Sequence, residues 1–380
     1  MTTLYHIFRF IKSNLSLAQK IVGCNMSNMN KPHNIYIHVP FCMSKCNYCA
    51  FFSSACANPD WDKYATKITS EVSYWSKKLG KTSVPTIFFG GGTPSLMPTK
   101  VFERILTEIY SCFDVQPDAE ITLESNPGTI DSQKLADFCT IGVNRLSIGV
   151  QSLNDDKLRF LGRKHTASDA LNLIHNATKQ NIRVSGDFIY GLPDETTHDV
   201  INICKQINSI GLQHCSLYEL TIEENTPFGK MKLCMPDNQT MADMYIAIQE
   251  NLKLSRYEVS NYATPGQYCR HNQNIWDGGA YIGIGPTAAG RIFLDNTWYE
   301  QIGDGVRFAA LSDDERAVEK ILTGLRTVHG VELTDDVKKV MNLPFAKSVP
   351  DMLRFTEQNR LTVTDQGILV LDDIITKLVK

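Results

Sequence analysis

Apolar runs alternate with amphipathic stretches through the middle of this chain. The apolar runs have the length of strands, and in the stretches between them apolar residues recur every three or four positions, as on a helix with one buried face. The predicted strands are 35–39, 86–89, 120–124, 145–151, 183–190 and 214–222. The predicted helices are 60–79, 100–113, 132–139, 167–179, 197–207 and 241–255. This alternation predicts an α/β protein with parallel strands, and six such units match a partial, six-strand (β/α)6 barrel.

The pattern changes after about residue 311. A predicted helix at 313–325 is followed by a second at 349–358 and by two short strands around a glycine turn within 361–370. These elements predict a small winged-helix-like α+β domain with a lid or partner-docking role. The predicted organisation is an N-terminal extension (1–32, flexible or amphipathic), a core with its connecting segment (33–300) and a C-terminal domain (301–380).

Composition narrows the class of protein. The chain has 380 residues, of which 43% are hydrophobic, and a formal net charge of −3, so a large core is expected and nucleic acid is not a predicted partner. Eleven cysteines are scattered through largely apolar segments, which is typical of free thiols in a reducing compartment. Because no run of eighteen apolar residues exists, no membrane span is predicted, and we expect a cytoplasmic protein.

The N-terminal segment has an unusual charge pattern. No Asp or Glu occurs before Asp60, and apolar residues recur at helical spacing between Leu4 and Leu15. Two interpretations are a transit segment, which would direct the protein to the mitochondrial matrix, and a membrane-surface helix, which would give peripheral membrane association. A third, which we favour, is an extension upstream of a start at Met26 or Met29.

Three cysteines, Cys42, Cys46 and Cys49, follow the first predicted strand. Iron–sulfur clusters are held by thiolates at fixed spacing on a tight loop. Three thiolates leave one iron of a 4Fe–4S cluster free to bind S-adenosylmethionine. The alternative is a zinc site completed by His38 or Cys56, although structural zinc motifs usually come as two paired knuckles.

A run of three glycines, Gly90 to Gly92, follows the second predicted strand. Glycine lets backbone N–H groups approach a charged ligand closely, so substitution at Gly91 or Gly92 is expected to weaken ligand binding and spare the cluster. Polar residues also end later strands, and the carboxyl ends of parallel barrel strands carry active sites. A carboxylate in an apolar strand needs polar partners, so we expect Glu124 and Asp187 to face the barrel mouth. The alternative is that these residues only cap helices or lie in loops.

With these motifs the chain resembles the coproporphyrinogen oxidase-like branch of the radical S-adenosylmethionine (SAM) superfamily, and is most similar to its HemW heme-chaperone family. The resemblance covers about residues 33–375 and includes the segments 36–42, 90–95, 124–128, 187–193 and 216–223. It implies a 4Fe–4S cluster on the three cysteines and a SAM site lined by Tyr36, Tyr48, Gly91, Gly92, Thr93, Glu124, Gln151, Arg163 and Asp187. It also implies heme as a ligand, respiratory hemoproteins as heme acceptors, an electron donor for the cluster, and a C-terminal domain of the type found in the family.

Two features separate the branches of this superfamily. Coproporphyrinogen dehydrogenases have a fourth cysteine two residues after the third. In this chain that position is Phe51. The segment 269–276 resembles the heme-chaperone signature H-N-x-x-Y-W, with Ile275 in place of the tyrosine, and it makes His271 a candidate axial ligand of heme iron. Both features favour a heme chaperone. The alternative is an oxygen-independent coproporphyrinogen III oxidase.

Overall fold

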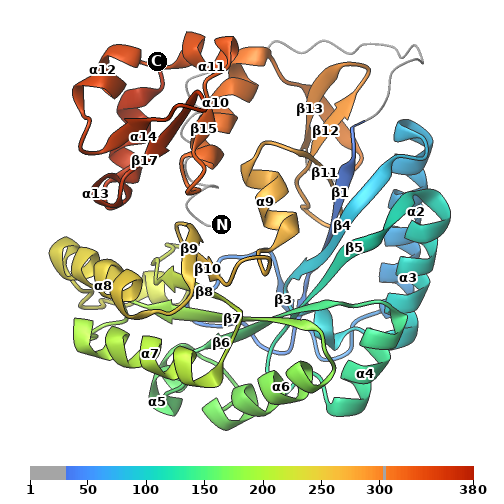
Figure 1. The fold of residues 1–380 in the computed structure, drawn as a ribbon. Coiled ribbons are helices and arrows are strands. Elements are labelled where there is room, and N and C mark those ends of the chain that lie inside the picture. Colours follow the sequence, from blue (N-terminus) through green and yellow to red (C-terminus); the bar gives the residue numbers. More distant parts are fainter. Residues whose placement is uncertain (1–30, 303–304) are drawn as a thin grey trace.

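The computed structural model describes residues 31–302 and 305–380. Its centre is one twelve-stranded sheet of order β14-β13-β12-β11-β1-β4-β5-β6-β7-β8-β10-β9 (Figure 1). The six predicted strands are confirmed as neighbours that pair in parallel. They are β1 (His33–Val39), β4 (Ser83–Gly91), β5 (Asp114–Ser125), β6 (Arg145–Gln151), β7 (Arg183–Tyr190) and β8 (His214–Glu219).

Strands from later in the chain extend this sheet at both edges. β11 adds in parallel to β1, and an antiparallel meander follows it, so the large sheet continues beyond residue 300. On the other edge β10 and β9 add antiparallel to β8. The added strands are β9 (Ser255–Glu258), β10 (Asn261–Ala263), β11 (Ala280–Ile284), β12 (Arg291–Leu294), β13 (Thr297–Ile302) and β14 (Arg307–Ala310).

The predicted helices form an arc along the outer face of the sheet (Figure 1). They are α2 (Trp61–Leu79), α3 (Thr99–Cys112), α4 (Ser132–Ile141), α6 (Ala167–Lys179), α7 (Thr197–Ile210) and α8 (Asn238–Asn251), with the short α5 (Asp155–Phe160) between β6 and α6. Alternate strand residues face the two sides: Phe89 packs on Phe102 of α3, with ring centroids 4.4 Å apart, while Phe88 faces the concave side. We call this concave side the barrel interior.

One helix, α9 (Arg270–Trp276), lies in the barrel interior (Figure 1). It contains the His271 segment, and it contacts β4, β11 and α10 (Asp313–Gly324). Because α9 lies on the face of the sheet opposite the outer helices, the segment 269–276 lines the barrel interior.

The C-terminal domain has a three-stranded sheet of order β15-β17-β16. The predicted helix over 349–358 is wrong, because Leu353 is buried while Arg354 and Phe355 are exposed, and this segment pairs with β17 as a strand. The strand predicted after residue 365 is also wrong, because the Thr364 side chain caps a helix there. The elements are α10 (Asp313–Gly324), β15 (Val331–Glu332), α11 (Asp335–Val340), α12 (Leu343–Ser348), β16 (Leu353–Phe355), β17 (Arg360–Val363), α13 (Asp365–Ile368) and α14 (Leu371–Leu378).

Within the part of the chain that the structure describes, no helix combines the length and apolar character needed to cross a bilayer. The interpretations of the N-terminal extension concern residues 1–32, of which residues 1–30 lie outside the described ranges.

Candidate functional site

The cysteine loop is closed by its own backbone. β2 (Phe41–Cys42) pairs with β3 (Ser54–Ala55), the Cys56 N–H donates to the Cys42 carbonyl at 3.0 Å, and the Cys49 N–H donates to the Cys46 carbonyl at 3.3 Å. All three thiols of the motif are free and half-buried. The loop therefore holds Cys42, Cys46 and Cys49 together at the carboxyl end of β1.

Arg163 lies against this loop. Its Nη1 donates to Cys46 Sγ at 3.4 Å, and its Nη2 donates to the Gly149 carbonyl at 2.9 Å and to Asn126 Oδ1. Burial acts to lower the pKa of Arg163, but Tyr48 and Cys46 raise it above its usual value. The guanidinium is therefore a fixed positive charge in contact with the Cys46 sulfur.

The glycine loop packs on the backbone that leads into the cysteine loop. The Gly92 N–H donates to Val39 O and the Thr93 N–H to Phe41 O, each at 2.7 Å. A Cβ on Gly92 would lie 2.6 Å from Phe41 O. Gly91 has a φ of 112°, and a Cβ there would lie 2.5 Å from the His38 ring. These glycines are thus required by the contact between the two loops, a role that the spacing of the motif did not indicate.

Two buried carboxyl groups, those of Glu124 and Asp187, lie near each other, and Glu124 contacts the glycine loop. Glu124 Oε2 accepts the Gly91 N–H at 3.0 Å, and Asp187 accepts from Ser147 at 2.8 Å and from Ser185 at 3.2 Å. Burial raises the pKa of Glu124 to about 8; the Gly91 N–H opposes this, and the nearby Asp187 adds to it. Burial also raises the pKa of Asp187. Glu124 is therefore mostly protonated at neutral pH.

Gln151, Asn126 and Arg163 converge over Gly149. A Cβ on Gly149 would lie 2.7 Å from Asn126 Oδ1, 2.8 Å from Gln151 Nε2 and 3.2 Å from Arg163 Nη2. Gln151 has a φ of 64°, a left-handed conformation that non-glycine residues rarely adopt and that is enriched at functional sites. Asn126 also donates to Thr93 Oγ1 at 3.0 Å. Asn126 thus joins two predicted site residues, Thr93 and Arg163, and its position in the turn after Glu124 was the available signal.

Both ring nitrogens of His38 are engaged. Nδ1 pairs with the Tyr36 hydroxyl at 3.0 Å and Nε2 with the Phe52 carbonyl at 2.8 Å. In residues 31–302 and 305–380, no three His, Cys, Asp or Glu side chains are arranged to hold a single metal ion. The zinc alternative therefore lacks a free fourth ligand at His38, whereas a four-iron cluster is wider than one ion and needs no such close grouping.

His271 lies in the barrel interior, in the first turn of α9. Its Nδ1 pairs with Thr86 Oγ1 at 2.8 Å, and its ring centroid is 5.0 Å from that of Phe88 and 6.4 Å from that of Tyr36. The residue is 2% exposed, and burial lowers its pKa to about 4. The predicted heme ligand is thus a neutral interior side chain in this conformation.

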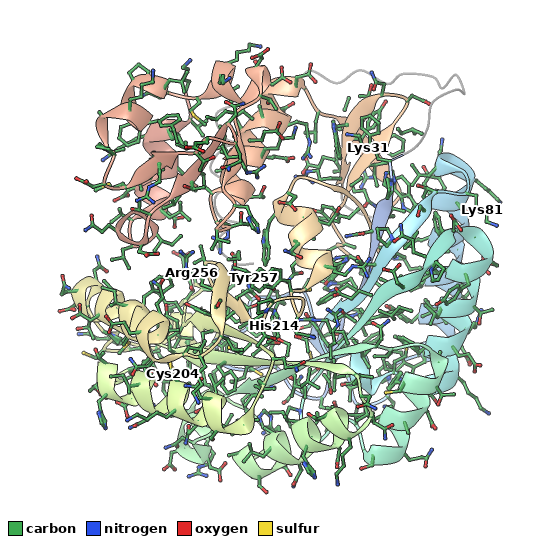
Figure 2. All side chains as sticks on the ribbon, viewed as in Figure 1. Lys31, Lys81, Cys204, His214, Arg256 and Tyr257 are labelled. Atoms are coloured by element: carbon green, nitrogen blue, oxygen red, sulfur yellow. The ribbon has the colours of Figure 1, made fainter. Side chains whose placement is uncertain are left out.

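Hydrogen bonds fix the first turn of α9. Glu120 forms an ion pair with Arg183 and accepts the Arg270 and His271 N–H groups, each at 3.0 Å. His214 Nε2 pairs with the Tyr257 hydroxyl at 2.7 Å, which also accepts the Cys269 N–H at 3.2 Å; Figure 2 labels His214 and Tyr257 near the centre of the molecule. Glu120 in the middle of β5 and Tyr257 on β9 therefore hold the His271 segment in place.

The raised pKa of Glu124 predicts a pH dependence of stability. Between pH 4.5 and about 8 the folded state keeps a proton that the unfolded state has released, so the contribution of this carboxyl to stability falls as pH rises through that range. Glu124→Gln cannot titrate, and its free energy of unfolding should therefore gain on that of the wild type as pH rises. Denaturant unfolding between about pH 5 and about pH 9 measures this. The exposed Glu103→Gln is the control, and an identical pH profile for wild type and Glu124→Gln would contradict the assignment.

Three comparisons with known proteins bear on this arrangement. A family model described as the Radical SAM superfamily matches residues 36–207. The chain is 37% identical over 266 residues to heme chaperone HemW of Escherichia coli (strain K12), covering 69% of this chain and 70% of that protein. It is 30% identical over 371 residues to heme chaperone HemW of Mycobacterium tuberculosis (strain ATCC 25618 / H37Rv), covering 92% and 95%.

Among solved structures, coproporphyrinogen III oxidase (HemN) from Escherichia coli, a radical SAM enzyme, matches with a TM-score of 0.77. The match covers 92% of this chain and 90% of that chain at 19% sequence identity. At this identity the likeness establishes the fold.

Proposed function

The chain belongs to the HemW family of radical SAM proteins, and from this we propose that it is a heme chaperone that binds heme and delivers it to respiratory hemoproteins. The observation that carries this choice is Phe51. It is 50% exposed beside the cysteine loop, at the position where the dehydrogenase branch has a fourth cysteine, and a phenyl ring supplies no thiolate. Its neighbour Phe52 is 56% exposed.

The residues present fit a 4Fe–4S cluster. Cys42, Cys46 and Cys49 are free thiols on one closed loop, and Arg163 supplies a positive charge at Cys46 that offsets thiolate charge. We propose these three cysteines as the cluster ligands, with an external electron donor. When bound, the cluster supplies the electron for reductive cleavage of SAM.

The residues present also fit SAM. Gly91 and Gly92 are half-buried beside the cysteine loop. The side chains of Asn126, Arg163 and the left-handed Gln151 gather polar groups over Gly149. Glu124, protonated near neutral pH, can donate a hydrogen bond as well as accept one. The proposed SAM residues are Tyr36, Tyr48, Gly91, Gly92, Thr93, Glu124, Gln151, Arg163 and Asp187, to which the geometry adds Asn126.

Heme is the cargo in this proposal. His271 is proposed as its axial ligand in a state where α9 has shifted, because the side chain is enclosed by Thr86, Phe88 and Tyr36 in the conformation described.

The experiment is heme titration of the anaerobically reconstituted protein, followed by its Soret band. Wild type is expected to bind heme, and His271→Ala to bind it more weakly or with a shifted band while keeping its cluster, since a lost axial ligand changes the iron's electronic state. The exposed His175→Ala on α6 is the matched control. Unchanged affinity and spectrum in His271→Ala would move the ligand elsewhere, with His38, His165 and Cys269 the next candidates.

The likeness to HemN favours one second candidate, anaerobic oxidation of coproporphyrinogen III. Incubation of the reconstituted protein with coproporphyrinogen III, SAM and reductant decides between the two functions. Formation of protoporphyrinogen IX at a catalytic rate would replace the chaperone proposal, whereas heme binding without turnover supports it.

A further inference from the structure

A chain of hydrogen bonds runs through the barrel interior from Asp187 to the start of α9. The Ser185 hydroxyl donates to Asp187 Oδ1 at 3.2 Å, and Ser185 Oγ also pairs with His214 Nδ1 at 2.8 Å. His214 Nε2 pairs with the Tyr257 hydroxyl at 2.7 Å, and that hydroxyl accepts the Cys269 N–H at 3.2 Å. We call these four contacts the Asp187–Cys269 relay.

The relay has a direction, because His214 is neutral. Burial lowers the pKa of His214 well below its usual value, so the imidazole carries a single N–H. Ser185 uses its only proton on Asp187, so the His214 proton is assigned to Nδ1, which donates to Ser185 Oγ. Nε2 is then the acceptor of the Tyr257 O–H. Each donor in the relay therefore points toward Asp187.

The two ends of the relay belong to the two proposed ligand sites. Asp187 is a proposed SAM residue, and each of its oxygens already accepts a serine hydroxyl, Oδ2 from Ser147 and Oδ1 from Ser185. Cys269 directly precedes α9, which contains the proposed heme ligand His271. The three side chains between the two ends are at most 3% exposed, so solvent does not interrupt the relay.

A ligand that donates to Asp187 changes the far end of the relay. SAM carries hydroxyl and amino donors, and one of these at Asp187 competes with the Ser185 hydroxyl. The released Ser185 hydroxyl can turn and donate to His214 Nδ1. His214, still neutral, then holds its one proton on Nε2 and donates to the Tyr257 oxygen, where it competes with the Cys269 N–H. Occupation of Asp187 thus weakens the hydrogen bond that holds the start of α9.

We propose that Ser185, His214 and Tyr257 are positioning residues that couple SAM binding to heme binding. The two states are α9 held by the Tyr257 hydroxyl and α9 released from it, and SAM favours the released state, in which His271 can reach heme. This inference rests on the proposed function, because it links the two ligands of that function. Coupling between two sites is typically about 5–150-fold, and heme must raise the affinity for SAM by the same factor.

Hydrogen exchange of the segment 269–276 measures the effect of SAM on α9 without heme. The anaerobically reconstituted full chain is compared with and without SAM, and reductant is left out so that SAM is not cleaved. In wild type, SAM is expected to accelerate exchange in this segment by about fivefold or more. Ser185→Ala and Tyr257→Phe should not respond to SAM, because each variant removes one link of the relay.

Heme titration with and without saturating SAM measures the coupling itself. Wild type should bind heme about fivefold or more tightly when SAM is bound. Both variants should lose this difference, but Ser185→Ala should keep the weaker affinity, whereas Tyr257→Phe should bind heme tightly without SAM. The phenylalanine can still stack on Tyr268, whose ring centroid lies 4.4 Å away. Tyr245→Phe is the matched control and should couple as wild type does, since its hydroxyl donates to Val259 O at 3.0 Å, outside the relay.

Failure of the inference and failure of the proposed function are distinguishable. A wild type that binds no heme, but in which SAM accelerates exchange of 269–276, ends the chaperone proposal and supports the relay. A wild type that binds heme equally with and without SAM, or whose exchange SAM does not accelerate, overturns the inference. Coupling of wild-type size in Ser185→Ala also overturns it. If a variant does not fold, the two wild-type comparisons still decide.

Discussion

Replacing Cys42, Cys46 or Cys49 with alanine is expected to abolish the cluster in each case. A three-thiolate site has no spare ligand, and the described residues offer no fourth cysteine in the loop to take over. Iron and sulfide content and the broad visible absorbance after anaerobic reconstitution measure the loss, which should be close to complete in each single variant.

Matched controls come from cysteines outside the loop. Cys112 donates to the Glu108 carboxylate on α3 and Cys204 is buried in α7, so alanine at either position should leave iron content unchanged. Cys56 is the stricter control, because it touches the loop through its backbone N–H, which alanine retains. Preparations that hold only zinc after reconstitution, or a full cluster in Cys46→Ala, would refute the assignment.

Gly92→Ala is expected to lose the cluster as well as SAM binding. The added Cβ would lie 2.6 Å from Phe41 O and 2.9 Å from Val39 O, atoms of the backbone that leads into Cys42. Backbone atoms cannot rotate away as a side chain can, so the strain energy should be larger than the value of about 1–3 kcal/mol that is typical of overpacking. We expect this strain to displace the cysteine loop. The motif alone predicts a loss of SAM binding with the cluster spared; the structure reverses the second half of that expectation.

Thermal unfolding, iron content and SAM titration of one preparation test this. Gly211→Ala is the matched control: Gly211 has a φ of 77°, but a Cβ there meets nothing within 4 Å, so only left-handed strain of about 1 kcal/mol is added. A Gly92→Ala protein with wild-type iron content and weak SAM binding would restore the simpler role of a ligand loop.

The sequence pattern predicted what depends on local periodicity. Strands such as 145–151 and their following helices carry their own signal, and the order of the six units follows from chain connectivity. It did not predict β9 to β14, because short strands such as Asn261–Ala263 are defined by distant partners rather than by their own pattern. The helix predicted over 349–358 failed for the same reason, since pairing with β17 decides that segment.

The candidate site was predictable where a residue type with known chemistry occurs at a telling position, such as the end of a predicted strand. Cysteine spacing, a glycine run and a carboxylate at a strand end are visible in one dimension. Arg163 and Cys46 are in contact although more than a hundred residues separate them in the sequence. The buried position of His271 depends on how α9 packs against the concave side of the sheet. Such relations arise from tertiary packing, so a single sequence carries little signal for them.

The pairing of β1 with β11 has a consequence for synthesis of the chain on the ribosome. β1 pairs with β4 on one side and with β11 on the other, and β11 begins roughly 240 residues after β1 ends. At roughly 5–20 residues per second, one edge of a strand that contains Ile35, Ile37 and Val39 stays uncovered for roughly 12–48 seconds. A nascent chain, or a fragment that stops before Ala280, therefore exposes an apolar strand edge open to intermolecular pairing, and productive expression depends on protecting that edge until the far half of the sheet has emerged.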